Sequence, residues 1–126
     1  MLAKKLIDAR TFLHQEHKDW MSKLNFYQDE IKFFQNELVL VLTKNSDNFS
    51  TIEHVAEYRD IFLKKLTLID NLRYEIMGHE RHLADNIPTK MDFLSVHPLI
   101  RKSFNEFEVA HATLKDNFRG FAAHND

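Results

Sequence analysis

Residues 13–41 read LHQEHKDWMSKLNFYQDEIKFFQNELVLV, and this stretch decides the fold. Its apolar residues recur every seven positions, which is typical of a long α-helix that packs against other helices. The same spacing continues outside the stretch, so residues 2–44 are predicted to form one helix. The recurring residues are Leu6, Leu13, Trp20, Tyr27, Phe34 and Val41, with Leu24, Ile31 and Leu38 at the interleaved positions.

The rest of the chain predicts two further helices. The polar residues 45–48 interrupt the pattern, and Ser50 or Thr51 is placed to cap a second helix of about residues 51–86. Pro98 suits the first turn of a third helix of about residues 97–123. Only two glycines and two prolines occur in the chain, which leaves few turns. The sequence therefore predicts an all-α fold, an antiparallel up-down-up bundle of three long helices in a single domain of residues 1–126.

The composition of the chain argues against some classes of binding partner. The chain of 126 residues is long enough to bury a core without disulfides, and it has no cysteine. Its 17 basic and 19 acidic residues are interspersed, so no basic surface favours a nucleic-acid partner. No apolar run approaches the ~18 residues that a membrane span needs. These features, with no apolar run near the N-terminus, predict a cytoplasmic protein.

A second apolar stripe lies on the first predicted helix, opposite the heptad positions. It consists of Phe12, Phe26, Phe33 and Leu40. A helix that is apolar on two sides lies between neighbours or meets another subunit. The sequence predicts a homodimer through this stripe, which would complete the bundle. In the alternative interpretation, the third helix covers it.

Two short segments carry the same residue types in reverse order, Glu16-His17 and His79-Glu80. In an antiparallel hairpin that turns near residue 48, residues whose numbers sum to about 96 lie level. His17 then faces His79, and Glu16 faces Glu80. Two histidines and two carboxylates are expected to converge there, similar in kind to the metal sites of helix bundles.

Three other histidines lie near this group. His14 and His82 fall at the same level but further round their helices, and His97, before Pro98, reaches the site if the connection is compact. Imidazoles and carboxylates suit divalent ions such as zinc, iron or manganese. Buried without a metal or mutual pairing, they would cost several kcal/mol. The predicted metal ligands or their close partners are His14, Glu16, His17, His79, Glu80 and His97.

The function predicted from these residues is divalent-metal binding, with no particular reaction. Sequence alone shows no open coordination position, so enzymatic activity is left undecided. Gly78 costs about 1 kcal/mol in a helix interior, and a close backbone approach beside the site would explain it. The alternative is a non-catalytic scaffold or protein-interaction bundle in which the histidine–glutamate pairs are structural.

The opening motif also carries a resemblance. Leu13-His14-x-Glu16-His17-x2-Trp20, followed by LNFYQDEI at residues 24–31, resembles a group of small, uncharacterised bacterial helical proteins. In that group a His-Glu pair ends the second long helix and a histidine opens the third. His79-Glu80 and His97 stand at the corresponding places. The resemblance implies a helical fold, and it implies no established activity, substrate or cofactor.

Overall fold

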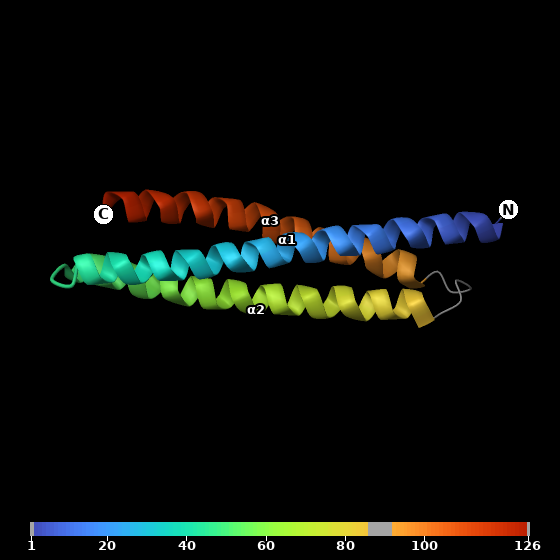
Figure 1. The fold of residues 1–126 in the computed structure, drawn as a ribbon, viewed down its shortest axis with the longest axis horizontal. Helices are drawn as coiled ribbons and strands as arrows, with labels where there is room; N and C mark the ends of the chain where they lie inside the picture. Colours follow the sequence, from blue (N-terminus) through green and yellow to red (C-terminus); the bar gives the residue numbers. More distant parts are fainter. Residues whose placement is uncertain (1, 86–91, 126) are drawn as a thin grey trace.

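The computed structural model describes residues 2–85 and 92–125, and three long helices make up almost all of them. These are α1 (Leu2–Lys44), α2 (Phe49–Asp85) and α3 (Asp92–His124). α1 and α3 run in the same direction and α2 runs against them (Figure 1). The predicted all-α three-helix bundle is confirmed. No helix in the described part of the chain is long and apolar enough to cross a membrane.

Two helix starts differ from those predicted. α2 begins at Phe49, because the Asn48 side chain accepts a hydrogen bond from the Thr51 N–H at 3.1 Å and caps the helix. Neither Ser50 nor Thr51 is the cap. α3 begins at Asp92, so Pro98 lies inside the helix and leaves the carbonyl of residue 94 without its helical donor.

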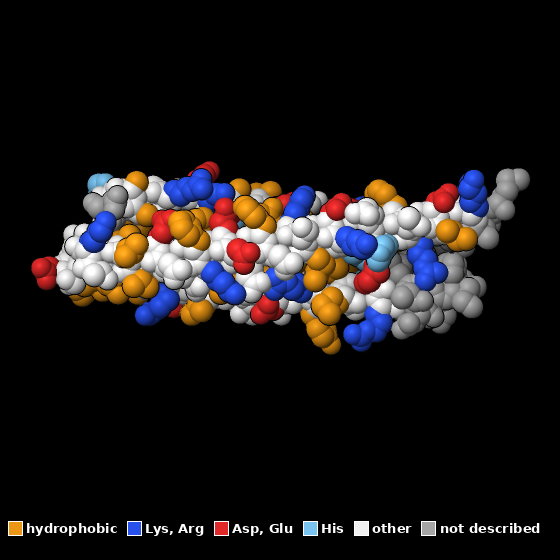
Figure 2. Space-filling model, viewed as in Figure 1, with side chains coloured by type: hydrophobic (Ala, Val, Ile, Leu, Met, Phe, Trp, Pro, Cys, Tyr) orange, Lys and Arg blue, Asp and Glu red, His pale blue; other side chains and the backbone are white. Residues whose placement is uncertain are grey.

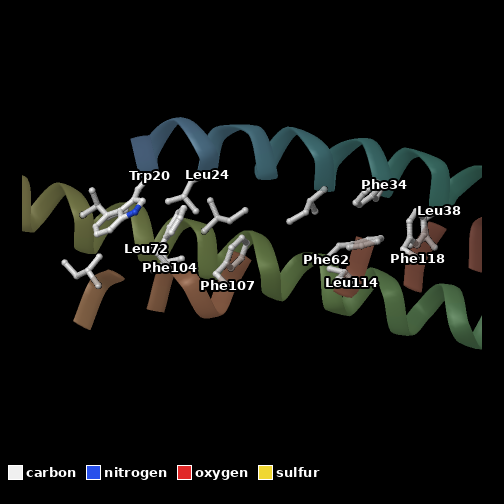
Figure 3. Packing of buried hydrophobic residues seen from close by; sticks show 14 of the residues in the cluster. Trp20, Leu24, Phe34, Leu38, Phe62, Leu72, Phe104, Phe107, Leu114 and Phe118 are labelled. Carbon is white, nitrogen blue, oxygen red and sulfur yellow. The ribbon is translucent and has the colours of Figure 1, made fainter. Parts of the chain in front are cut away.

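The core follows the heptad positions of all three helices. Phe34, Phe62 and Phe118 come from different helices, and their ring centroids lie 5.1–6.0 Å apart. Further along, the Trp20 ring stacks on Phe104 at 5.5 Å (Figure 3). Aromatic rings of this size bury a large apolar area and contribute to the stability of the bundle. The buried cluster comprises Trp20, Leu24, Ile31, Phe34, Leu38, Val41, Val55, Phe62, Ile69, Leu72, Ile76, Ile100, Phe104, Phe107, Leu114 and Phe118.

Polar contacts tie the α1–α2 turn to the end of α3. The Asn45 side-chain amide donates to the Asn125 carbonyl at 2.8 Å, and the Thr51 hydroxyl donates to the Asn125 side chain at 3.0 Å. Thr51 is buried, so its hydroxyl needs such a partner. These bonds hold α1 and α3 in one axial register at this end.

The second apolar stripe of α1 is exposed in the single chain. Phe12, Phe26, Phe33 and Leu40 keep 58–61% of their surface accessible. The interpretation that the third helix covers them is wrong, because α3 packs against a neighbouring face of α1, where Phe34 meets Phe118 at 5.2 Å, and leaves the stripe more than half exposed. Apolar side chains alternate with charged ones on the face shown in Figure 2.

Candidate metal centre

Each helix contributes one histidine to a buried cluster, near the end where α2 finishes and α3 starts (Figure 1). His17 Nε2 lies 3.1 Å from His79 Nδ1 and 3.2 Å from His97 Nδ1. The exposed fractions of the three side chains are 3%, 6% and 1%. One nitrogen from each ring falls within 4.8 Å of the other two, so the cluster could hold a metal ion.

Heptad geometry explains why three polar rings point into the core. Each histidine occupies a heptad position that apolar residues fill elsewhere along the same helix. Because that face of the helix packs into the core, the histidine is buried with it. This pattern was readable from the sequence, and it singles out His97 as strongly as the other two. Leu24, Ile31 and Leu38 continue the position of His17, Leu72 continues that of His79, and Phe104 and Phe118 continue that of His97.

A carboxylate holds the outer nitrogen of two of the rings. His17 Nδ1 donates to Glu80 at 2.8 Å, and His97 Nε2 donates to Glu16 at 2.5 Å. Arg101 also donates twice to Glu16, at 2.7 and 3.0 Å. A carboxylate behind a metal-binding histidine fixes the tautomer and the ring orientation. Here it leaves the inner nitrogen of each ring as the one with the free lone pair.

The electrostatics keep both carboxylates ionised. The Arg101 hydrogen bond lowers the pKa of Glu16 most, against the effect of burial, and His97 lowers it further. Burial alone would raise the pKa of Glu80, but hydrogen bonds from His17 and His14 outweigh it and the net pKa is lowered. Burial lowers the pKa of His97, and this exceeds the opposing pull of Glu16. The His97 ring is therefore favoured in its neutral form.

If all three rings are neutral, the cluster has too few protons to make both of its contacts between ring nitrogens into hydrogen bonds. A neutral His97 donates its one ring N–H to Glu16, and a neutral His17 donates its one ring N–H to Glu80. His17 Nε2 and His97 Nδ1 then face each other at 3.2 Å with a lone pair each. His79 has one proton to offer the lone pair of His17, so at most one of the two contacts between ring nitrogens is a hydrogen bond. A cation at the centre would satisfy all three nitrogens.

The contacts of Glu16 and Glu80 differ from those predicted from the sequence. Glu16 was expected to face Glu80, but it lies one residue before His17, about 100° round α1, and turns toward His97 on α3. His14 was expected level with His82, but its Nδ1 bonds Glu80 at 2.6 Å, and 49% of its side chain is exposed. His82 is exposed and outside the cluster.

The expectation of a close backbone approach at Gly78 is wrong. A Cβ built at Gly78 meets nothing within 4 Å, and the residue is exposed. Gly78 lines a surface groove between α2 and α3 that also touches His79. A side chain at this position would enter open space and disturb no packing contact.

A second polar layer, 14 residues along α1 and α3, provides an internal comparison. His111 Nε2 donates to Glu30 at 2.7 Å, and Lys115 donates to the same carboxylate at 2.6 Å. The Glu30–His111–Lys115 group thus repeats Glu16–His97–Arg101. Ile31 and Lys65 stand where His17 and His79 would be, and His111 Nδ1 is buried without a partner in the described chain.

The two polar layers differ in what their histidines can do. A glutamate, histidine and basic residue between parallel α1 and α3 recur without further histidines, so that group is a device of helix pairing. The two added histidines, His17 and His79, are what distinguish the cluster as a candidate metal site. His111 lies 14 residues beyond His97 on α3 and is not part of the three-histidine cluster.

The nitrogen spacing fits a first-row divalent ion. With Zn–N bonds of 2.0–2.1 Å and tetrahedral angles, ligand nitrogens lie about 3.3 Å apart. The contacts at 3.1 and 3.2 Å are close to that value. One nitrogen of each ring lies within 4.8 Å of the other two, and an ion at the centre would draw the third pair toward the same spacing.

Comparison of the chain with protein-family models, with curated proteins and with solved structures found no significant match. The function is therefore argued from the geometry of the site.

Proposed function

We propose that the protein binds one divalent metal ion through His17 Nε2, His79 Nδ1 and His97 Nδ1. Glu80 and Glu16 would orient the first and third of these rings from behind. The observation that carries this function is the pair of contacts between ring nitrogens at 3.1 and 3.2 Å, which neutral, glutamate-bound histidines cannot both satisfy.

The ligand set favours zinc among the divalent ions considered. Three imidazoles suit zinc and iron(II), whereas carboxylate and water ligands suit manganese and magnesium better. Glu16 and Glu80 are already engaged with ring nitrogens, so their oxygens face away from the centre of the cluster. We expect the affinity for zinc to exceed that for iron(II), and manganese to bind most weakly.

Metal analysis of the protein purified without a histidine tag tests this function. We expect about one zinc ion per chain, removable by a chelator, because one set of three histidine nitrogens converges in the described part of the chain. Zinc at ~100 times its Kd should raise the free energy of unfolding by about 2.7 kcal/mol. The single tryptophan reports binding directly, since Trp20 stacks on the His97 ring at 4.9 Å.

The scaffold alternative predicts the opposite result. Protein that carries no metal, and whose melting temperature does not move on addition of zinc, iron(II) or manganese, would leave the histidine–glutamate pairs as structural contacts. Titration of Trp20 fluorescence with magnesium is the matched control, since a hard ion with oxygen ligands should cause no change.

We also propose a homodimer that covers the exposed stripe Phe12, Phe26, Phe33 and Leu40. Four large apolar side chains on one helix, each more than half exposed, support this pairing. Phe33→Glu should place a charge in the interface and halve the mass measured by light scattering. Wild type that already runs as a monomer, or a variant that keeps the dimer mass, would contradict it. Leu63→Glu, equally exposed on α2, is the control.

A further inference from the structure

A groove of about 610 Å³ runs between α1 and α2 beside the histidine cluster. Its volume is within the usual 300–1,000 Å³ of small-ligand sites. Glu80 lines it, with both carboxylate oxygens engaged, one by His14 at 2.6 Å and one by His17 at 2.8 Å. His17 also lines the groove, so the groove reaches the histidine cluster beside Glu80.

Two uncompensated cations line the groove from opposite walls. Lys18 comes from α1 and Arg81 from α2, and both are exposed. Within residues 2–85 and 92–125 neither has an ion pair or a hydrogen bond. Glu80 carries one negative charge and accepts hydrogen bonds from His14 and His17, so the two cations leave the groove with an excess of positive charge. On the face in Figure 2, basic side chains lie near a histidine in contact with an acidic side chain.

Three apolar side chains also line the groove, beside the polar Ser22 and Asn25. Ile76 is buried at its base, and Met21 and Met77 line it from the two helices. Met77 leaves 52% of its surface exposed. Methionine side chains are flexible and polarisable, so they adapt to an apolar guest better than branched residues do. A cationic site beside an adaptable apolar surface matches a molecule with an anionic head and an aliphatic tail.

We propose that this groove binds a medium-chain aliphatic carboxylate. The carboxylate pairs with Lys18 and Arg81, and the aliphatic chain lies on Met21, Ile76 and Met77. Charge complementarity selects the anion, and apolar burial at about 25 cal/mol per Å² drives the tail into the groove. This binding goes beyond metal binding, and the contacts proposed for the carboxylate and the chain involve none of the three histidines of the cluster.

The test uses octanoate as the probe, followed by amide chemical shifts and by calorimetry, with the protein treated once with chelator and once with zinc. We expect saturable binding in both conditions, with the largest shifts at residues of the groove. Octanol, which has the same chain length without the charge, should bind at least tenfold more weakly. Binding to the chelator-treated protein alone would still support the groove, whatever becomes of the metal site.

Charge reversal identifies the cations. Lys18→Glu with Arg81→Glu should weaken octanoate at least tenfold while the helical signal in circular dichroism stays unchanged, because both side chains are exposed. Lys32→Glu with Lys64→Glu, which reverses two exposed charges on the same two helices outside the groove, is the matched control. Equal affinity for octanol and octanoate, or equal loss in both double variants, would overturn the proposal.

Discussion

Replacing His97 by alanine is expected to abolish tight zinc binding, whereas replacing His111 by alanine should leave it intact. Both histidines are buried on α3, and both donate Nε2 to a glutamate of α1. Only the Nδ1 of His97 meets other histidines. If zinc binding provides ~10–16 kcal/mol, loss of one of three ligands removes several kcal/mol, or at least about a hundredfold in affinity.

The pair of variants also controls for folding. Each substitution removes one hydrogen-bond donor from a carboxylate, but Glu16 keeps its bond from Arg101 and Glu30 keeps its bond from Lys115. The two variants should therefore lose similar stability in the absence of metal, about 1–3 kcal/mol. Zinc affinity by competition with a chelator and urea unfolding of the metal-free protein separate the two effects. Equal zinc affinity in both variants would show that the three-histidine cluster is not the site.

The carboxylates behind the rings give a graded result in the same assay. Glu80→Gln keeps the side-chain shape and a hydrogen bond to His17. It removes the negative charge that makes the imidazole a stronger electron-pair donor to the metal ion. Loss of such a partner typically costs 10–100-fold in metal affinity. Glu30→Gln is the matched control in the second polar layer, where no change in zinc affinity is expected.

Phe62→Ala should cause the largest loss of stability among single core substitutions. The Phe62 side chain is fully buried, and its ring lies 5.1–6.0 Å from those of Phe34, Tyr58 and Phe118. Removing a buried phenylalanine costs about 3–5 kcal/mol, because the neighbouring rings close the cavity only in part. A bundle with a total stability of about 5–15 kcal/mol would lose a large share of it.

Urea unfolding followed by circular dichroism measures this loss. Leu63→Ala, the next residue on α2 and 53% exposed, is the control and should change stability by no more than about 0.5 kcal/mol. The slope of the transition should be the same in all three proteins if the fold is unchanged. A midpoint for Phe62→Ala that matches wild type would contradict the packing of this aromatic layer.

Most of the fold could be predicted, because heptad periodicity is a local property of each segment. The α1 bounds agree with the prediction, and α2 ends within one residue of it. The start of α3 was wrong by five residues, because the helix continues through Pro98 although proline removes one of its backbone hydrogen bonds. His97 and Ile100, which flank Pro98, are both buried.

Half of the candidate site was also predictable. Level-matching across the α1–α2 hairpin correctly brings His17 to His79, because the short turn sets the register of antiparallel neighbours. The same reasoning could not pair Glu16 with His97. That contact depends on the axial position of α3 relative to α1. The sequence that connects α2 to α3 does not specify this position.

The sequence by itself determined three helices, their apolar faces and the histidines that lie on those faces, since each follows from spacing along one helix. Only the tertiary structure decided which nitrogen of each ring points inward. His17 and His97 have their outer nitrogens taken by Glu80 and Glu16 from neighbouring helices. A ring's orientation depends on partners from other helices, which sequence spacing does not contain, and that orientation turns three buried histidines into a candidate metal centre.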